Sequence, residues 1–227
     1  RHPVYVSEHG ATCTQMPVGR MLRGPAARPC PCASAWVRYA SQKGSSNRWK
    51  ERQSHDHYVK KAAQLGYRSR AAFKLLELDD KFQILRPGLL ALELGSAPGS
   101  WTQVLLARKL RAVAIDVLPM ESLHPDCFFL QGDFTCRTVQ DDLLREIFMR
   151  EPGGADLILS DVSPNRSGIK SLDEARFTGM IEDALLLARQ CLKPGGVFVT
   201  KLLQGADAPK LVKAMRAFSK PALHKPP

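Results

Sequence analysis

From residue 88 onward, short apolar runs alternate with longer stretches in which apolar residues recur every three or four positions. The continuous apolar runs predict buried strands at 89–94, 112–117, 127–130, 155–159 and 197–203. The helical period predicts helices at 101–110, 139–148, 173–192 and 208–218. Because alternating strands and helices are typical of a parallel sheet flanked by helices, we expect an α/β, Rossmann-like fold.

The N-terminal third of the chain has a different pattern. Residues 1–47 keep no apolar period and are rich in Pro, Ala, Gly, Ser and Arg, so we expect a basic, poorly ordered leader. Such acid-poor leaders resemble organelle transit peptides, although a plain tail would look the same. Residues 48–87 interleave basic and aromatic residues, and Ser69 can cap a helix that follows it. The remaining 88–227 form the predicted core.

Positive charge is concentrated in front of this core. The formal net charge is +11, made up of +5 in residues 1–47, +5 in 48–87 and +1 in 88–227. A basic surface with aromatic residues suits a nucleic acid, although a charge run is also compatible with an ordinary solvated face. The candidate RNA-binding residues are Arg48, Lys60, Lys61, Arg68 and Arg70. No apolar stretch approaches the roughly 20 residues of a membrane span, and the spacing of the cysteines predicts neither a disulfide scaffold nor a metal site.

Polar residues follow the first three predicted strands, at the sheet edge where α/β proteins bind ligands. The first strand is followed by Gly95-Ser96-Ala97-Pro98-Gly99, in which Pro98 removes a backbone donor, and Trp101 adds bulk. Such a loop suits a cofactor without phosphates. Asp116 ends the second strand and can accept hydrogen bonds from ribose hydroxyls, and Asp133 follows the third. These features favour S-adenosylmethionine, although each aspartate alone could equally cap a loop.

Two further residues at strand ends indicate chemistry. The fourth strand is followed by Asp161, and the fifth contains Lys201 within an apolar run. A lysine in such a run is costly unless it is partnered or placed at the strand end, where its ammonium group reaches solvent.

These motifs together resemble the FtsJ/RrmJ family of RNA 2′-O-methyltransferases, in order and spacing, over residues 46–218. The matching segments are 68–75, 95–101, 116–120, 130–134, 160–165 and 199–201. The resemblance implies an S-adenosylmethionine-dependent methyltransferase fold. It also implies that Gly99, Trp101, Asp116, Asp133 and Asp161 contact the cofactor. Lys74, Asp161 and Lys201 match three members of the family's catalytic tetrad, with Lys201 as the proton acceptor.

One departure from the family concerns the fourth tetrad member, a glutamate on a late strand. No glutamate follows Glu182 in this sequence, so we expect a C-terminally truncated core whose last strands are missing. This departure leaves open a second hypothesis, a catalytically impaired RNA-binding ribosome-assembly factor.

The resemblance implies methylation of a ribose 2′-hydroxyl in rRNA. With the Arg-containing leader, it extends to family members that modify a uridine of the mitochondrial large-subunit rRNA. We therefore expect a monomeric, metal-free mitochondrial enzyme. A nuclear, nucleolar or cytoplasmic location remains an alternative, as does a tRNA or nucleolar pre-rRNA substrate. A nicotinamide-dependent oxidoreductase is disfavoured by the 95–101 loop and the two lysines. A lysine accepts a proton only as the neutral amine, which burial and a second cation favour and Asp161 opposes.

Overall fold

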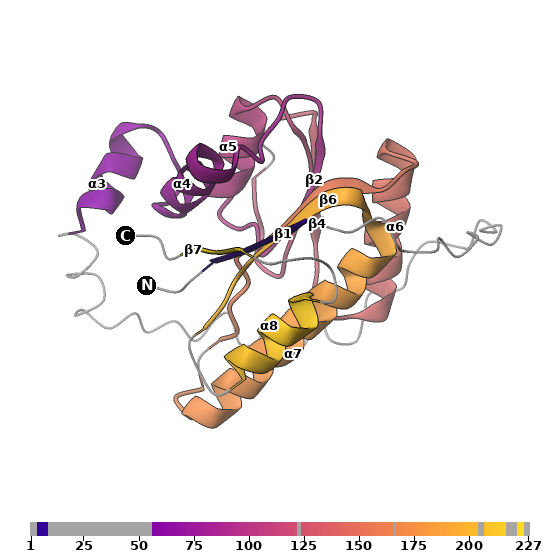
Figure 1. Ribbon diagram of the computed structural model, residues 1–227. Coiled ribbons are helices and arrows are strands. Elements are labelled where there is room, and N and C mark those ends of the chain that lie inside the picture. Colours follow the sequence, from indigo (N-terminus) through magenta and orange to yellow (C-terminus); the bar gives the residue numbers. More distant parts are fainter. Residues whose placement is uncertain are drawn as a thin grey trace.

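A central parallel sheet organises the protein (Figure 1). The computed structural model describes residues 4–8, 56–121, 124–165, 167–203, 207–216 and 222–224. The parallel strands are β2 (Leu90–Leu94), β3 (Arg111–Asp116), β4 (Cys127–Gln131), β5 (Ala155–Ser160) and β6 (Leu192–Lys201). They are ordered β4-β3-β2-β5-β6, and the order reverses beside β2. The predicted α/β, Rossmann-like fold is confirmed.

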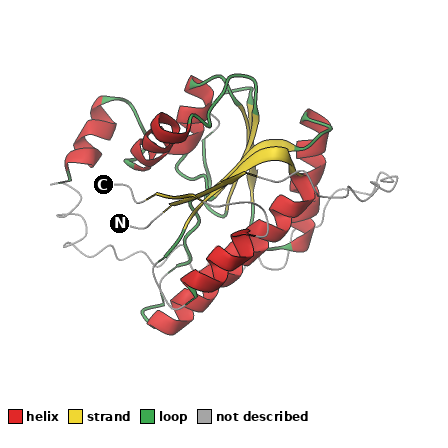
Figure 2. Ribbon diagram, in the orientation of Figure 1, coloured by secondary structure: helices red, strands yellow, loops and turns green. Residues whose placement is uncertain are grey.

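Helices cover both faces of this sheet (Figure 2). One face carries α4 (Ala71–Phe82) and α5 (Ser100–Ala107), with α3 (His57–Gln64) beside α4. The other face carries α6 (Arg137–Arg150), α7 (Lys170–Cys191) and α8 (Ala208–Arg216). Since successive side chains of a strand point to opposite faces, Leu157 and Leu159 pack with α4 and α5. Ile158 packs with the helices on the other face.

Two further strands extend the sheet beyond β6. β1 (Val4–Glu8) runs antiparallel to β6, with Val4 opposite Lys201 and Glu8 opposite Val197. β7 (Ala222–His224) pairs antiparallel with the outer side of β1. The expectation that residues 4–8 belong to a poorly ordered leader is therefore corrected, and so is the expectation that the sheet ends at β6. The reason is that β6 offers a free row of backbone donors and acceptors, which a short β-branched segment can pair.

The predicted helices and strands differ from the observed ones mainly at their boundaries. α4 begins at Ala71, and the Ser69 hydroxyl accepts a hydrogen bond from the Ala71 backbone N–H at 3.2 Å. β6 starts at Leu192 instead of 197, because Lys193-Pro194-Gly195-Gly196 lies within the strand next to an irregularity in its pairing with β5. Within the described parts of the chain, no helix is long and apolar enough to span a membrane.

Candidate active site

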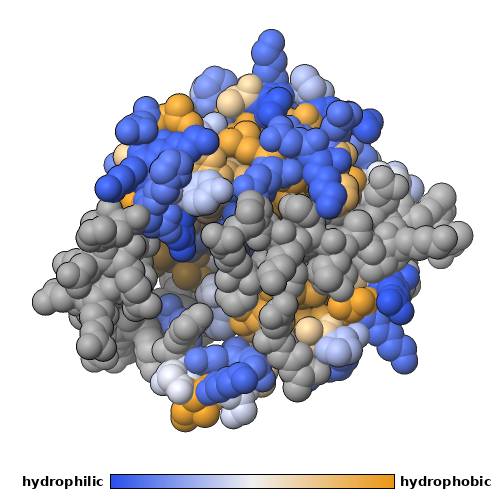
Figure 3. Space-filling model, turned by 60° about the vertical axis from the view of Figure 1, so that its left-hand side comes forward, coloured by the Kyte–Doolittle hydropathy of each residue, from blue (hydrophilic) through white to orange (hydrophobic). Residues whose placement is uncertain are grey.

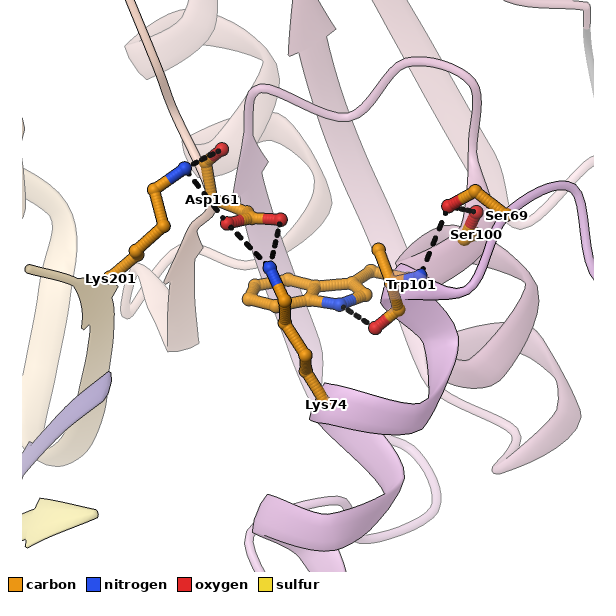
Figure 4. A network of polar contacts seen from close by, with 7 residues as sticks. Ser69, Lys74, Ser100, Trp101, Asp161 and Lys201 are labelled. Atoms are coloured by element: carbon orange, nitrogen blue, oxygen red, sulfur yellow. Dashed lines mark hydrogen bonds and ion pairs between the residues drawn. The ribbon is translucent and has the colours of Figure 1, made fainter. Parts of the chain in front are cut away.

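Three charged side chains that lie far apart in the sequence meet at the carboxyl edge of the sheet (Figure 4). Asp161 directly follows β5, Lys201 is the last residue of the neighbouring β6, and Lys74 reaches over from α4. Lys201 Nζ lies 3.2 Å from Asp161 Oδ1 and donates to the Asp161 carbonyl oxygen at 3.3 Å. Lys74 Nζ lies 3.3 Å from Asp161 Oδ2. The structure therefore brings together all three residues that the sequence motifs singled out as catalytic.

The two lysines differ in their exposure to solvent. The Lys201 side chain is 11% exposed, and that of Lys74 is 39% exposed. Two ammonium groups share one carboxylate here, so the loss of one proton would leave a charge-balanced cluster. Burial disfavours the uncompensated charge, and Lys201 is the more deeply buried of the pair. The arrangement suits a site in which one lysine accepts a proton while the other stays paired with Asp161.

The loop between β2 and α5 approaches its neighbours closely. Gly95 has φ 78°, and a Cβ atom at this position would lie 3.1 Å from Val162 Cα, next to Asp161. Gly99 has φ 104° and immediately precedes the first helical residue of α5. Both backbone conformations favour glycine. Glycine at position 95 thus allows the loop to lie close to the chain segment that carries Asp161.

Asp116 and Asp133 both occupy this edge and both hold their own loops. Asp116 accepts the Ala97 N–H at 2.9 Å and the Leu118 N–H at 2.8 Å, one at each carboxylate oxygen. Burial raises the Asp116 pKa above its usual value. Asp133 accepts from the Thr135 N–H and hydroxyl through one oxygen. Each aspartate therefore acts as a loop cap, and both keep lone pairs for a ligand.

Trp101, which the resemblance places among the cofactor contacts, links two helices in the structure. Its side chain is buried, and its indole N–H donates to the Ala71 carbonyl oxygen at 2.7 Å. This hydrogen bond joins the first turn of α5 to the first turn of α4, which carries Lys74 (Figure 4). Trp101 thereby fixes the position of α4 relative to the loop between β2 and α5.

Glu93 is a feature of the site that the sequence motifs did not single out. It is the last but one residue of β2, is 2% exposed and accepts a hydrogen bond from the Thr102 hydroxyl at 2.6 Å. Burial raises the Glu93 pKa to about 8, and the nearby Asp116 and Asp161 carboxylates add to this rise. Its only sequence signal is an acid within an otherwise apolar strand. A neutral Glu93 avoids a third negative charge beneath the site.

The candidate RNA-binding residues fall into two groups. Lys60, Lys61 and Arg70 are exposed on the surface formed by α3 and α4. Lys61 Nζ lies 5.3 Å from the Phe73 ring centroid, and Arg70 is ion-paired with Asp56. Arg68 is only partly exposed, and its guanidinium contacts other loops of the protein. Arg48 lies outside the described residues.

Figure 3 brings forward the side of the molecule that carries α3 and α4. Hydrophilic residues extend across the upper part of this view, with apolar residues between them. Among the described residues, no group of three or more His, Cys, Asp or Glu side chains is arranged to hold a metal ion.

Comparison with known proteins identifies the family. The sequence model described as FtsJ-like methyltransferase matches residues 67–227. "Ribosomal RNA large subunit methyltransferase E" of Stutzerimonas stutzeri is 42% identical over 186 residues, which cover 80% of this chain and 88% of that protein. The protein of the same name from an Azoarcus species is 45% identical over 175 residues, covering 75% of this chain and 83% of that protein.

A solved structure agrees with these sequence comparisons. The crystal structure of a Plasmodium falciparum protein, assigned as a ribosomal RNA methyltransferase, superposes with a TM-score of 0.60 at 29% identity. The superposition covers 66% of this chain and 86% of that one. The match of the family model to more than half of the chain, together with the relatives above 40% identity, leads to one assignment. The chain belongs to the FtsJ-like methyltransferase family.

Proposed function

We propose that this protein methylates a ribose 2′-hydroxyl of large-subunit ribosomal RNA, with S-adenosylmethionine as the methyl donor and Lys201 as the general base. The observation that carries the proposal is the cluster at the carboxyl edge of the sheet, in which Lys74 and Lys201 share the Asp161 carboxylate. The relatives named as large-subunit rRNA methyltransferases support the RNA class. A uridine target and action as a monomer are parts of the same proposal.

The residues of the site fit this cofactor. When bound, S-adenosylmethionine supplies an electrophilic methyl group on a positively charged sulfur. Asp116 would accept hydrogen bonds from its ribose hydroxyls, because the backbone N–H groups of its own loops do not use every lone pair of its carboxylate. The glycines at 95 and 99 let the backbone approach a ligand closely. Asp133 and the Asp161 carboxylate would supply further hydrogen-bond acceptors to the cofactor.

The chemistry assigned to this chain's own residues is proton removal and positioning. A ribose hydroxyl is a poor nucleophile at neutral pH until a base takes its proton. Lys201 Nζ, as the neutral amine, would accept that proton and become an ammonium group beside Asp161. Asp161 then stabilises the new charge and fixes the direction of the amine through its carboxylate and its carbonyl oxygen. Lys74 holds the second oxygen of Asp161 and places positive charge where the hydroxyl becomes negative.

A catalytically impaired RNA-binding assembly factor remains the second candidate function. The observation in its favour is the register of β1 on β6. Glu8 pairs with Val197, four residues from Lys201, which is about 13 Å along a strand. Within the described residues, no glutamate is therefore aligned with Lys201 on the neighbouring strand.

The decisive experiment is transfer of a labelled methyl group from S-adenosylmethionine to rRNA by the purified protein. Methylated 2′-hydroxyls are mapped as alkali-resistant linkages. We expect incorporation at one nucleotide of large-subunit rRNA and none into tRNA. RNA binding without incorporation would support the assembly factor instead. Incorporation confined to tRNA would overturn the proposed substrate.

We also propose a mitochondrial location, on the basis of the basic leader. Microscopy of the full chain fused to a fluorescent protein tests this location, and we expect a mitochondrial signal. A nuclear or cytoplasmic signal would contradict this location.

A further inference from the structure

Hydrogen bonds connect the segment between α3 and α4 to α5, the helix that follows the 95–99 loop. α5 begins directly after Gly99, and four hydrogen bonds join its first turn to residues 66–71. They are Gln103 Nε2 to Gly66 O at 2.9 Å, Arg68 N to Gln103 Oε1 at 2.8 Å, Ser69 Oγ with Ser100 Oγ at 2.6 Å, and Trp101 Nε1 to Ala71 O at 2.7 Å. Because the two segments share so many contacts, they are positioned as one unit.

Arg68 extends this connection to a second loop. Its Nη1 donates to the Pro98 carbonyl oxygen at 3.0 Å and to the Glu121 carbonyl oxygen at 3.2 Å. Pro98 belongs to the loop after β2, and Glu121 to the loop after β3. The Glu121 carboxylate also lies 3.4 Å from Nη2, but its side chain is 93% exposed. Such an exposed ion pair contributes little, so the two carbonyl contacts carry the connection.

Asp116 joins the same two loops from the inside. Its carboxylate accepts N–H groups from Ala97 in the first loop and Leu118 in the second. Arg68 and Asp116 therefore close one pair of loops at two places, one residue apart in the first loop. Since Asp116 is the proposed ribose ligand, the position of its carboxylate depends on both loops staying in place.

We infer that Arg68 is a positioning residue of the cofactor pocket and not one of the RNA phosphate contacts. Arg68 donates hydrogen bonds to protein carbonyl groups, and its side chain is 23% exposed. Arg70, two residues later, is 54% exposed and lies on the outer surface of the same segment. Both carbonyl contacts come from Nη1, which lies one bond farther along the side chain than the nitrogen of a lysine would. A lysine at position 68 would therefore keep the charge but would fall short of the two carbonyl oxygens.

This inference rests on the proposed function, because it assigns Arg68 to the S-adenosylmethionine pocket. It also makes the cofactor and RNA sites interdependent, since one segment carries the RNA-facing residues and holds the cofactor loops. Binding of either ligand should then strengthen binding of the other by the same factor.

The test compares Arg68→Lys, Arg68→Ala and Arg70→Ala with the unaltered protein. Calorimetry without RNA gives the Kd for S-adenosylmethionine. RNA binding measured from low to high salt gives the Kd for RNA and its salt slope. We expect both Arg68 variants to bind the cofactor roughly five- to thirtyfold more weakly, as for the loss of one or two hydrogen bonds, with the salt slope for RNA unchanged. Arg70→Ala should keep cofactor affinity within twofold and lower the salt slope by about one.

The Arg68→Lys variant is the most informative one, because it keeps the positive charge. It therefore distinguishes contact with an RNA phosphate from positioning of the loops. If Arg68→Lys binds the cofactor as tightly as the unaltered protein does, the inference is overturned. A reduced salt slope for Arg68→Ala with unchanged cofactor affinity also overturns it, because Arg68 would then be a phosphate contact. Thermal unfolding of each variant checks that the fold is kept. If the unaltered protein itself binds no cofactor, the proposed function fails, which is a different result from failure at Arg68.

Discussion

At the scale of single residues, the electrostatics of the site depend on whether the buried Glu93 adds a negative charge to those of Asp116 and Asp161. Asp161 must be charged to hold two lysines, and Asp116 is placed to accept hydrogen bonds. Glu93 lies close enough to both for their charges to raise its pKa. A protonated Glu93 removes that repulsion while its oxygen still accepts the Thr102 hydroxyl. Below a pH of about 8, the neutral form of this buried acid therefore predominates and adds no charge to the cluster.

This state of Glu93 predicts a pH dependence of stability. Burial raises the Glu93 pKa from 4.5 to about 8, so between these values the folded protein holds a proton that the unfolded chain releases. The stabilisation is complete below pH 4.5 and is lost as pH rises through about 8, by at most about 1.4 kcal/mol per pH unit. Glu93→Gln should remove this loss, so its free energy of unfolding should fall less steeply over that range in chemical denaturation. Asp80→Asn, at an exposed position of α4, is the control and should keep the original slope. Equal slopes for Glu93→Gln and the unaltered protein would refute the assignment.

At the scale of elements, the strand ends that carry the site were predictable from the sequence. The added edge strands β1 and β7 were not. β2, β3 and β5 are mostly apolar, because parallel strands are buried on both faces. That pattern also places Asp116 and Asp161 at the carboxyl edge. β1 is only five residues long, and its partner β6 lies about 190 residues away in the chain, so no local pattern indicates the pairing. The hydrogen bonds of Arg68 and the burial of Glu93 are likewise set by packing between distant segments.

β1 predicts a role for the N-terminal residues in stability. Deletion of residues 1–9 would expose the backbone edge of β6 that ends at Lys201 and would leave β7 without its partner. We expect a lower thermal midpoint and a larger loss of methyl transfer than of RNA binding, because Lys201 lies at the freed edge. Deletion of residues 11–19 is the control, since it leaves β1 in the chain. An unchanged midpoint and unchanged activity after the first deletion would contradict the pairing of β1 with β6.

At the scale of the whole molecule, a nearly neutral core carries a basic N-terminal third. The net charge of +11 comes almost wholly from residues before 88, and residues 56–87 of that region carry the α3–α4 surface beside the site. This distribution would attract a phosphate backbone and direct it toward Lys74 and Lys201. The motifs predicted which residues gather at the carboxyl edge of the sheet, because strand ends are local in sequence. They did not predict that Arg68 contacts neighbouring loops while Arg70 is exposed, since that depends on where each guanidinium finds its partners.

The charge distribution predicts a measurable salt effect. The Lys60→Ala/Lys61→Ala double variant should weaken RNA binding and lower the salt slope by about two, because each lysine would neutralise one phosphate. The Lys210→Ala/Lys213→Ala double variant on α8, on the opposite face of the sheet, has the same change in charge and serves as the control. RNA binding over a salt series is the measurement. An equal loss of slope in both variants would show that overall charge, and not the α3–α4 surface, attracts the RNA.

The role of Lys201 as general base is tested most directly by the rate of a single methyl transfer with enzyme in excess over RNA. Lys201→Ala should lower this rate by roughly 10²- to 10⁴-fold, the usual contribution of a general base, while RNA and cofactor affinities stay within a few fold. Lys210→Ala should react at the unaltered rate. A Lys201→Ala protein that transfers the methyl group at the rate of the Lys210→Ala control would show that Lys201 is not the base.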